Sequence, residues 1–149
     1  MSETFTTLLR IRYAECDAQQ VVFNSRYAEY ADLAATEFIR AILGGYQSLI
    51  DRGLDNQVVN LNISWKSSAR FDDVLRLETW VPKVGNSSFT MTTMIKQFES
   101  HELVAEVTTT YVFVDAKSYQ KTSIPDDIRK KLLTGAPNVT VNLAGIELK

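Results

Sequence analysis

This chain contains one long amphipathic helix followed by a run of strands, and few folds accommodate that order. Between Asn24 and about Leu43, apolar residues recur every three or four positions, which predicts a helix with one apolar stripe. Between Val59 and Asp115 the apolar period changes to two, which predicts strands joined by short connections. The helical stripe consists of Tyr27, Tyr30, Ala31, Ala34, Phe38 and Ile42.

Both ends of this helix carry recognisable signals. Asn24 or Ser25 can cap the first turn, because a short polar side chain accepts a hydrogen bond from N–H groups that lack a partner. The pair Gly44-Gly45 ends the helix, since glycine adopts the left-handed conformation at low cost. Small side chains allow a sheet to approach closely, so we expect a central helix: Ala28, Ala31, Ala34 and Ala35.

Five strands are predicted, one before the helix and four after it. The first spans Leu9–Tyr13, where apolar residues alternate with arginines. The other four lie at Val59–Lys66, Leu75–Val81, Ser88–Phe98 and Leu103–Asp115. We therefore expect an α+β fold, in which one long central helix is wrapped by a five-stranded antiparallel sheet.

The C-terminal part adds short elements and no second domain. Pro125 opens a short helix, with Asp126 and Asp127 at its positive end. Residues 136–149 are expected to form either an added edge strand or a loose tail. Because no repeat or change of composition divides the chain, residues 1–149 are expected to form a single domain.

The predicted sheet needs a partner. One helix cannot cover a five-stranded sheet on both faces, and the two longest strands carry apolar residues on both sides, as at Leu103–Val107. Pairing of a second copy edge to edge is the simplest solution. We expect a homodimer or a dimer of dimers.

Charge and cysteine content narrow the setting of the protein. The net charge is −2, and no basic stripe appears, so nucleic acid is not expected as a partner. No apolar run approaches the ~20 residues that span a bilayer, so no membrane association is expected. One cysteine and an N-terminus without a basic segment leading into an apolar stretch indicate a cytoplasmic protein.

The residue set excludes several kinds of catalytic site. The only histidine is His101, in a predicted hairpin turn, which argues against histidine-based triads and zinc sites. Glycine-rich phosphate loops are absent, since the only paired glycines end a helix. We expect no metal.

Asp17 is the strongest catalytic candidate. It lies in an irregular loop between the first strand and the start of the apolar helix. A partly desolvated carboxylate there can act as a general base for water or as a nucleophile. The N–H groups of the helix start can stabilise an oxyanion. A loop aspartate is also often just solvated or a cap.

Three segments resemble one known family. The stretch Arg12–Tyr27 is similar to the signature of the 4-hydroxybenzoyl-CoA thioesterase family of hotdog-fold proteins, with an acidic loop residue, an apolar run and a helix-opening tyrosine. Ser67–Leu75 resembles the family's turn before its third strand. Val114-Asp115 with Ile124-Pro125 resembles its closing segment, and the likeness extends from about Leu8 to Leu133.

The resemblance implies a hotdog fold and hydrolysis of an acyl thioester. Asp17 would attack the thioester carbonyl or activate water, and the Asn24 backbone N–H would polarise that carbonyl. Tyr27 and Phe23 would contact the substrate, although core packing of Tyr27 is an equal alternative. Asp32 matches an acidic position of the family, with a structural role favoured. Coenzyme A would enter as part of the substrate, with no separate cofactor.

Two departures from the family pattern limit what the resemblance implies. Family members with a basic cluster before the fourth strand use it on the phosphates of coenzyme A, and this chain has Gly85-Asn86-Ser87-Ser88 there. Lys83 is the nearest remaining cation, so an acyl-carrier-protein thioester stays an alternative. Gln19-Gln20 replaces the commoner glycine of the catalytic loop.

Other functions remain open at this point. A hotdog hydratase would pair a histidine with a carboxylate, which the lone His101 disfavours. A non-catalytic acyl-CoA binding module needs no base, and a protein-interaction module needs only its dimer surface. Cys16 is predicted to be a bystander that faces away from Asp17. The sequence leaves the acyl group itself open.

Overall fold

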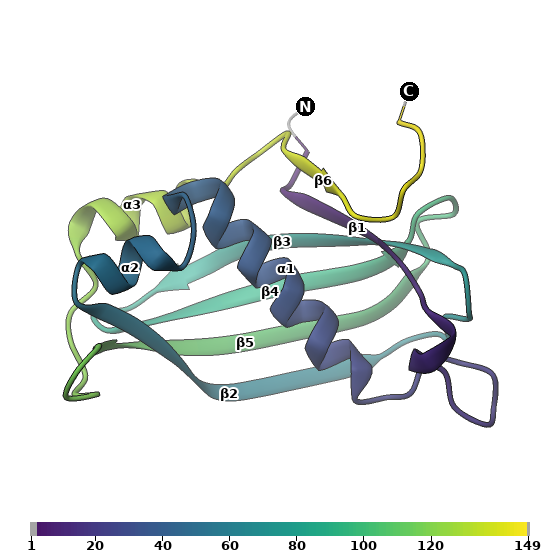
Figure 1. Ribbon diagram of the computed structural model, residues 1–149, viewed down its shortest axis with the longest axis horizontal. Coiled ribbons are helices and arrows are strands. Elements are labelled where there is room, and N and C mark those ends of the chain that lie inside the picture. The colour runs from purple at the N-terminus through teal and green to yellow at the C-terminus, as the bar shows by residue number, and fades with distance from the viewer. Residues whose placement is uncertain (1–2, 149) are drawn as a thin grey trace.

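Helix α1 (Arg26–Leu43) lies along one face of a curved sheet in the computed structural model, which describes residues 3–148 (Figure 1). The predicted stripe faces the sheet, and Ala34 and Phe38 are fully buried, whereas Ile42 is only partly covered. The helix ends at Gly44, whose φ of 85° and N–H to Arg40 carbonyl bond of 3.0 Å make the expected left-handed stop.

The sheet has six strands in the order β2-β5-β4-β3-β1-β6. Every neighbouring pair is antiparallel except β1 and β6, which run parallel. The predicted arrangement of one long helix, a largely antiparallel sheet and a short C-terminal helix is confirmed. The strands are β1 (Thr6–Arg10), β2 (Leu54–Trp65), β3 (Val74–Val84), β4 (Ser88–Gln97), β5 (Leu103–Asp115) and β6 (Thr140–Asn142). The shorter helices are η1 (Tyr13–Glu15), α2 (Gln47–Asp51) and α3 (Asp126–Thr134).

The sheet differs from the prediction in its number of strands. The sixth strand comes from the tail, where β6 pairs with β1 and the Thr6 N–H donates to the Val139 carbonyl at 3.0 Å. Of the two expectations for this tail, the edge strand is therefore the observed one. The strand β2 also begins at Leu54, five residues before the start that its alternating pattern indicated, because its first residues pair with the end of β5.

Two local predictions differ from the structure, the second of them only in part. Tyr13 lies in the helical turn η1, and its side chain is 78% exposed instead of half-buried in a strand. Ser25 occupies the N-cap position, but its side chain makes no capping bond, because its backbone is already helical at φ −76° and ψ −14°. A capping side chain normally needs an extended backbone at that residue.

The core lies between α1 and the sheet and is closed at one end by α3. Phe5 of the N-terminal segment meets Phe38 edge to face, with ring centroids 5.6 Å apart. Ile128 and Leu132 of α3 are fully buried against the same cluster. A second buried cluster, which includes Ile11, Val22 and Tyr27, lies at the opposite end of α1, and Cys16 of the Asp17 loop packs against it.

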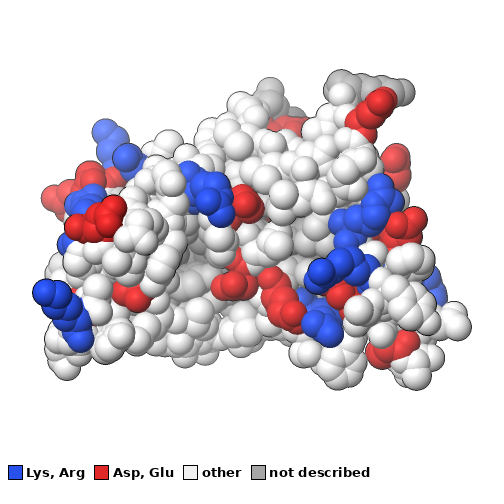
Figure 2. All heavy atoms as spheres, viewed as in Figure 1, with Lys and Arg blue, Asp and Glu red and all other residues white. Residues whose placement is uncertain are grey.

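The two edges of the sheet are unequal. The edge strand β6 has three residues, whereas β2 has twelve and carries exposed apolar side chains at Val58, Leu61 and Trp65. Charges of both signs are interspersed on the face shown in Figure 2, with no single-sign patch across it. No helix within residues 3–148 combines the length and the apolar character that crossing a bilayer requires.

Candidate active site

Asp17 begins a tight turn that its own carboxylate helps to hold. The Asp17 N–H donates to the Val21 carbonyl and the Gln20 N–H donates to the Asp17 carbonyl, both at 2.9 Å. The Gln19 N–H donates to the Asp17 carboxylate at 2.8 Å. Gln20 has a φ of 65°, so this departure from glycine does not remove the left-handed conformation of the loop. The carboxylate is partly exposed and keeps room for further contacts.

A surface cavity of about 330 Å³ opens beside Asp17. The rings of Tyr13 and Phe71 meet edge to face at 5.7 Å and are largely exposed at this cavity. The guanidinium of Arg70 also lines it and pairs with no carboxylate among residues 3–148. The cavity thus offers one carboxylate, one cation and an aromatic wall. Its lining residues are Tyr13, Cys16, Asp17, Gln20, Arg70 and Phe71.

The segment before β3 is held against the Asp17 loop by backbone bonds. The Val22 N–H donates to the Ala69 carbonyl at 2.8 Å, and the Asp72 N–H donates to the Ile11 carbonyl at 3.0 Å. These bonds place Arg70 and Phe71 at Asp17 although they are more than fifty positions away in the chain. Sequence reasoning identified Ser67–Leu75 only as a turn and did not assign Arg70 or Phe71 to the site.

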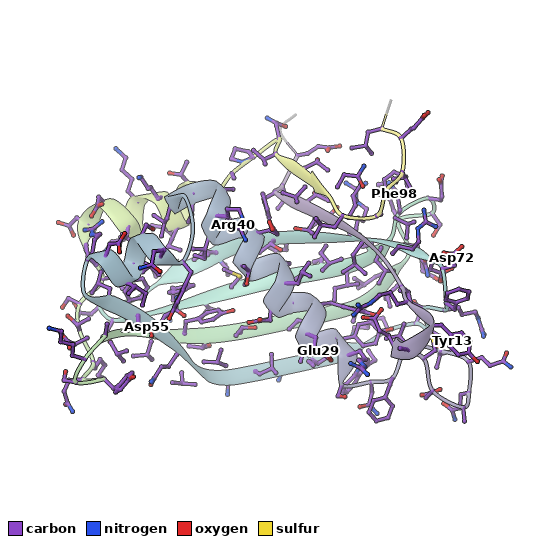
Figure 3. All side chains as sticks on the ribbon, in the orientation of Figure 1. Tyr13, Glu29, Arg40, Asp55, Asp72 and Phe98 are labelled. Carbon is purple, nitrogen blue, oxygen red and sulfur yellow. The ribbon has the colours of Figure 1, made fainter. Side chains whose placement is uncertain are left out.

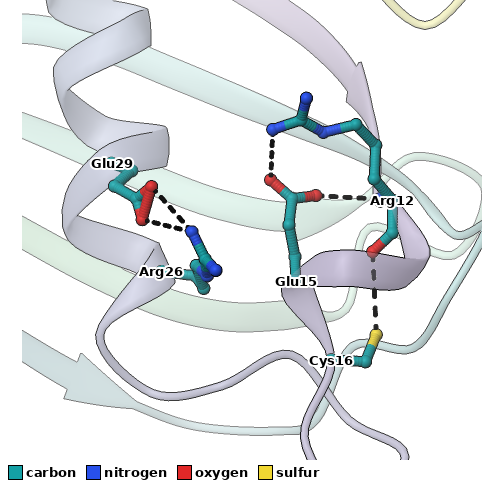
Figure 4. Close-up of polar contacts among 5 residues, drawn as sticks. All are labelled: Arg12, Glu15, Cys16, Arg26 and Glu29. Atoms are coloured by element: carbon teal, nitrogen blue, oxygen red, sulfur yellow. Dashed lines mark hydrogen bonds and ion pairs between the residues drawn. The ribbon is translucent and has the colours of Figure 1, made fainter.

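Glu15 holds the Asp17 loop in place by hydrogen bonds, and sequence reasoning did not identify it as a site residue. Its carboxylate is buried and accepts from the Arg12 N–H at 2.8 Å and from the Arg12 guanidinium at 3.2 Å (Figure 4). Its carbonyl accepts from the Phe23 N–H at 2.9 Å, which ties η1 to the approach of α1. The spacing of Arg12 and Glu15, three residues apart, is the available sequence signal.

Tyr30 lies close to this anchor. Its buried hydroxyl makes no hydrogen bond to any residue of the described range. Burial, and next the charge of the Glu15 carboxylate, raise the pKa of Tyr30 far above its ordinary value. The Tyr30 hydroxyl thus lies near the Glu15 carboxylate, which contributes to the raised pKa.

Cys16 shares the cavity with Asp17, although we expected the two side chains to face apart. Its Sγ lies 3.9 Å from the Arg12 carbonyl (Figure 4). Burial, followed by the charges of Glu15 and Asp17, raises the pKa of the Cys16 thiol. Few thiolates therefore form at neutral pH, which makes Cys16 a weak nucleophile.

The start of α1 carries the other predicted site residues. The backbone N–H groups of Asn24 and Tyr27 donate to no backbone acceptor among residues 3–148. The Asn24 carbonyl accepts from the indole N–H of Trp65 at 3.1 Å. Phe23 is partly exposed, whereas Tyr27 is 2% exposed and burial raises its pKa to about 12.

The cavity next to Asp17 does not include the side chains of Phe23, Asn24 or Tyr27. Their roles toward a substrate stay predictions. Arg129 donates to the Gly85 carbonyl at 2.7 Å and to the Asn86 carbonyl at 3.3 Å, so the one arginine at the loop before β4 is engaged by backbone. Within the described part of the chain, no group of three histidine, cysteine or acidic side chains could hold a metal ion.

Comparison with known proteins identifies the family of this chain. Residues 11–132 match the model of the thioesterase-like superfamily. The acyl-CoA thioester hydrolase YbgC of Escherichia coli O6:H1 is 26% identical over 80% of this chain and 89% of its own. The long-chain acyl-CoA thioesterase FadM of Escherichia coli K12 is 24% identical over 85% of this chain and 95% of its own.

A solved structure shows the same fold. The 1,4-dihydroxy-2-naphthoyl-CoA thioesterase from Synechocystis superposes with a TM-score of 0.78 at 21% identity, over 87% of this chain and 95% of that one. Because the family model spans most of the chain, including the Asp17 loop, α1 and the four long strands, the family is established. The chain belongs to the thioesterase-like superfamily.

Proposed function

We propose that this protein hydrolyses an acyl-CoA thioester to a carboxylic acid and free coenzyme A, with Asp17 as the reacting carboxylate. The observation that carries the proposal is a partly exposed Asp17 in an open cavity, close in sequence to a helix start with unpaired N–H groups. Relatives named as acyl-CoA thioester hydrolases support the reaction class. A single cysteine fits a reducing compartment, and we place the reaction in the cytoplasm.

Two reaction routes use the same residue. In the first, an Asp17 oxygen attacks the thioester carbon, the thiolate of coenzyme A leaves, and water cleaves the resulting anhydride. In the second, Asp17 removes a proton from water as its oxygen attacks the thioester carbon, and the C–S bond then breaks so that coenzyme A leaves as a thiolate, which takes up the proton. In both, the oxygen that becomes negative needs hydrogen-bond donors, and the Asn24 N–H at the positive end of α1 is our candidate.

We propose that the working unit is a dimer joined through β2. This strand is the long open edge, whereas β6 closes the other edge with three residues. The Trp65 end of β2 lies at the start of α1, because the Trp65 indole donates to the Asn24 carbonyl. The Leu54 end of β2 lies near α2. Antiparallel pairing of two β2 strands would bring the Asp17 end of each copy next to the α2 end of the other.

Asp17→Asn tests the catalytic claim. The change removes the charge and keeps the shape, so kcat on an accepted acyl-CoA should fall by about 10²–10⁴, the usual contribution of a general base. Substrate affinity should survive, because the lost interaction belongs to the transition state. Calorimetric binding of the same acyl-CoA and the melting temperature complete the measurement.

Asp72→Asn is the matched control. Asp72 is exposed near the same cavity without lining it, and pairs only with Arg10 at 3.3 Å. Its variant should keep its activity. If Asp17→Asn hydrolysed acyl-CoA at nearly the normal rate, Asp17 would be removed from the mechanism. If the unchanged protein bound acyl-CoA without hydrolysing it, the protein would be a non-catalytic acyl-CoA binding module instead. Parallel assays with acyl-carrier-protein thioesters decide which carrier the enzyme accepts.

A further inference from the structure

Trp65, the last residue of strand β2, reaches across to the start of helix α1. Its indole N–H donates to the Asn24 carbonyl at 3.1 Å, although the two residues are 41 positions apart in the chain. Figure 1 shows the end of β2 beside the start of α1. Trp65 is 53% exposed, so the hydrogen bond, more than burial, determines where the indole lies.

The backbone around Trp65 is held firmly to the sheet. Trp65 pairs with Ala105 of β5. The next two residues, Lys66 and Ser67, donate their backbone N–H groups to the Val104 carbonyl at 2.8 and 3.1 Å. A side chain that extends from such a paired strand is placed more accurately than one on a loop. The indole can therefore act as a fixed donor toward the helix start.

The Asn24 carbonyl depends on this donor. Asn24 lies before Arg26, the first residue of α1, and its carbonyl accepts from no backbone N–H among residues 3–148. The Trp65 indole is thus its hydrogen-bond partner within the described part of the chain. Without the indole, this carbonyl would have to turn to water for a partner.

The peptide on the other side of Asn24 is held as well. The Phe23 N–H donates to the Glu15 carbonyl, and the Arg26 N–H donates to the Phe23 carbonyl, both at 2.9 Å. The Phe23 carbonyl and the Asn24 N–H belong to one planar peptide and point in opposite directions. The direction of the Asn24 N–H is therefore set by two peptides. Arg26 holds the first of them and Trp65 holds the second.

These bonds lie at the end of the molecule that carries the Asp17 loop. Figure 3 shows Tyr13, which lines the Asp17 cavity, and Glu29, in the first turn of α1, in the same half of the molecule. Asp55, near the other end of β2, lies in the opposite half. The indole bond therefore belongs to the half that contains the reacting carboxylate.

We propose that Trp65 is a positioning residue of the hydrolysis: its indole N–H holds the Asn24 carbonyl and thereby aims the Asn24 N–H at the thioester carbonyl oxygen. This inference rests on the proposed thioesterase activity, in which the Asn24 N–H is the oxyanion donor. Trp65 itself touches no reacting atom. A donor must lie about 2.7–3.1 Å from the oxygen that becomes negative, so a small rotation of the Asn24 peptide weakens it.

A purely structural role of Trp65 would need its ring and not its N–H. The residue lies on the open edge of the sheet, where the ring could simply cover apolar surface in a dimer. The deciding change therefore removes the N–H alone. Benzothienylalanine does so, because a sulfur atom replaces the indole N–H and the shape of the ring is kept. In a Trp80→Phe background, Trp65 is the remaining tryptophan of the chain and is replaced selectively.

We expect the replacement of Trp65 to lower kcat on an accepted acyl-CoA by roughly 10- to 100-fold and to leave KM within about two-fold. Loss of a whole oxyanion donor costs about 10²–10³ in kcat, and a misaimed donor loses part of that. Trp80→Phe is the matched control and should keep its activity, because Trp80 lines a different cavity at the end of α3. Trp65→Phe should show the same loss as benzothienylalanine. Melting temperature and dimer mass are measured for each protein.

The carbonyl stretch of a bound thioester reports the donor directly, because a hydrogen bond to the oxygen lowers its frequency. Asp17→Asn should bind acyl-CoA without hydrolysing it, so difference infrared spectra can be recorded with an isotope-labelled carbonyl. In this variant the bound band should lie below the band of the free thioester. Replacing Trp65 by benzothienylalanine in the same variant should move the band back toward the free value. A merely structural role would not shift it.

An unchanged kcat after removal of the N–H would overturn the positioning role, and so would a loss that appears only in KM or in the melting temperature. An unshifted carbonyl band would do the same. Failure of the proposed function gives different results. If the unchanged protein binds acyl-CoA without hydrolysing it, the thioesterase is refuted and the band still decides the role of Trp65. If Asp17→Asn still hydrolyses, Asp17 leaves the mechanism and the kcat comparison decides. A protein that binds no acyl-CoA would refute both proposals.

Discussion

Leu61→Lys should dissociate the dimer that β2 is proposed to form. Leu61 is 47% exposed and lies opposite Thr109 on the helix-facing side of the open edge. Burying a whole leucine is worth about 1.5–3 kcal/mol, so covering the exposed half contributes about 1 kcal/mol. A two-fold dimer contains the residue twice, so the two copies together contribute about 2 kcal/mol. Losing that contribution raises the Kd of the dimer about 30-fold. The desolvation of the two introduced lysine ammonium groups would weaken the dimer further.

Sedimentation or light scattering over a dilution series measures this Kd. Leu143→Lys is the control, because Leu143 is 49% exposed and lies just after β6, at the opposite edge. The unchanged protein and this control should remain dimeric at concentrations where Leu61→Lys is monomeric. The monomer should also lose hydrolysis, since each site is expected to need two copies. A Kd equal to that of the control, or a stable monomer before any substitution, would refute the β2 interface.

Three further outcomes follow from the Asp17 loop and from the turn after β5. Cys16→Ala should keep most of the activity, because the raised thiol pKa leaves little thiolate, and a loss as deep as that of Asp17→Asn would contradict this. Gln20→Gly should increase the free energy of unfolding by about 0.5 kcal/mol in denaturant titrations. The change removes ~1–2 kcal/mol of left-handed backbone strain, and the greater conformational freedom of glycine in the unfolded chain offsets part of this gain. The N–H groups of Ser118 and Lys117 donate to the Asp115 carboxylate and lower its pKa in the folded protein. The stability that these bonds contribute is therefore complete above pH 3.8, the ordinary pKa of the group, and is lost as the pH falls through the lower pKa of the folded state. The difference in melting temperature between the unchanged protein and Asp115→Ala should therefore shrink in acid, and a difference that grew would reverse this sign.

The sequence by itself determined the elements whose signals are local. The period of the apolar residues predicted α1 and the long strands, and Gly44 predicted the end of the helix, because backbone sterics and one-sided burial act within a few residues. Asp17 was singled out by its place in the loop before the helix, by the absence of other chemistry in the chain and by the resemblance of Arg12–Tyr27 to a family signature. The family match over residues 11–132 agrees with the predicted fold, and the role of Asp17 stays a prediction.

Only the tertiary structure decided which distant residues share a cavity. Arg70 and Phe71 reach Asp17 through backbone bonds between segments far apart in the chain, and no local pattern encodes such contacts. Tyr13 left the predicted strand because the buried Glu15 carboxylate closes a helical turn there.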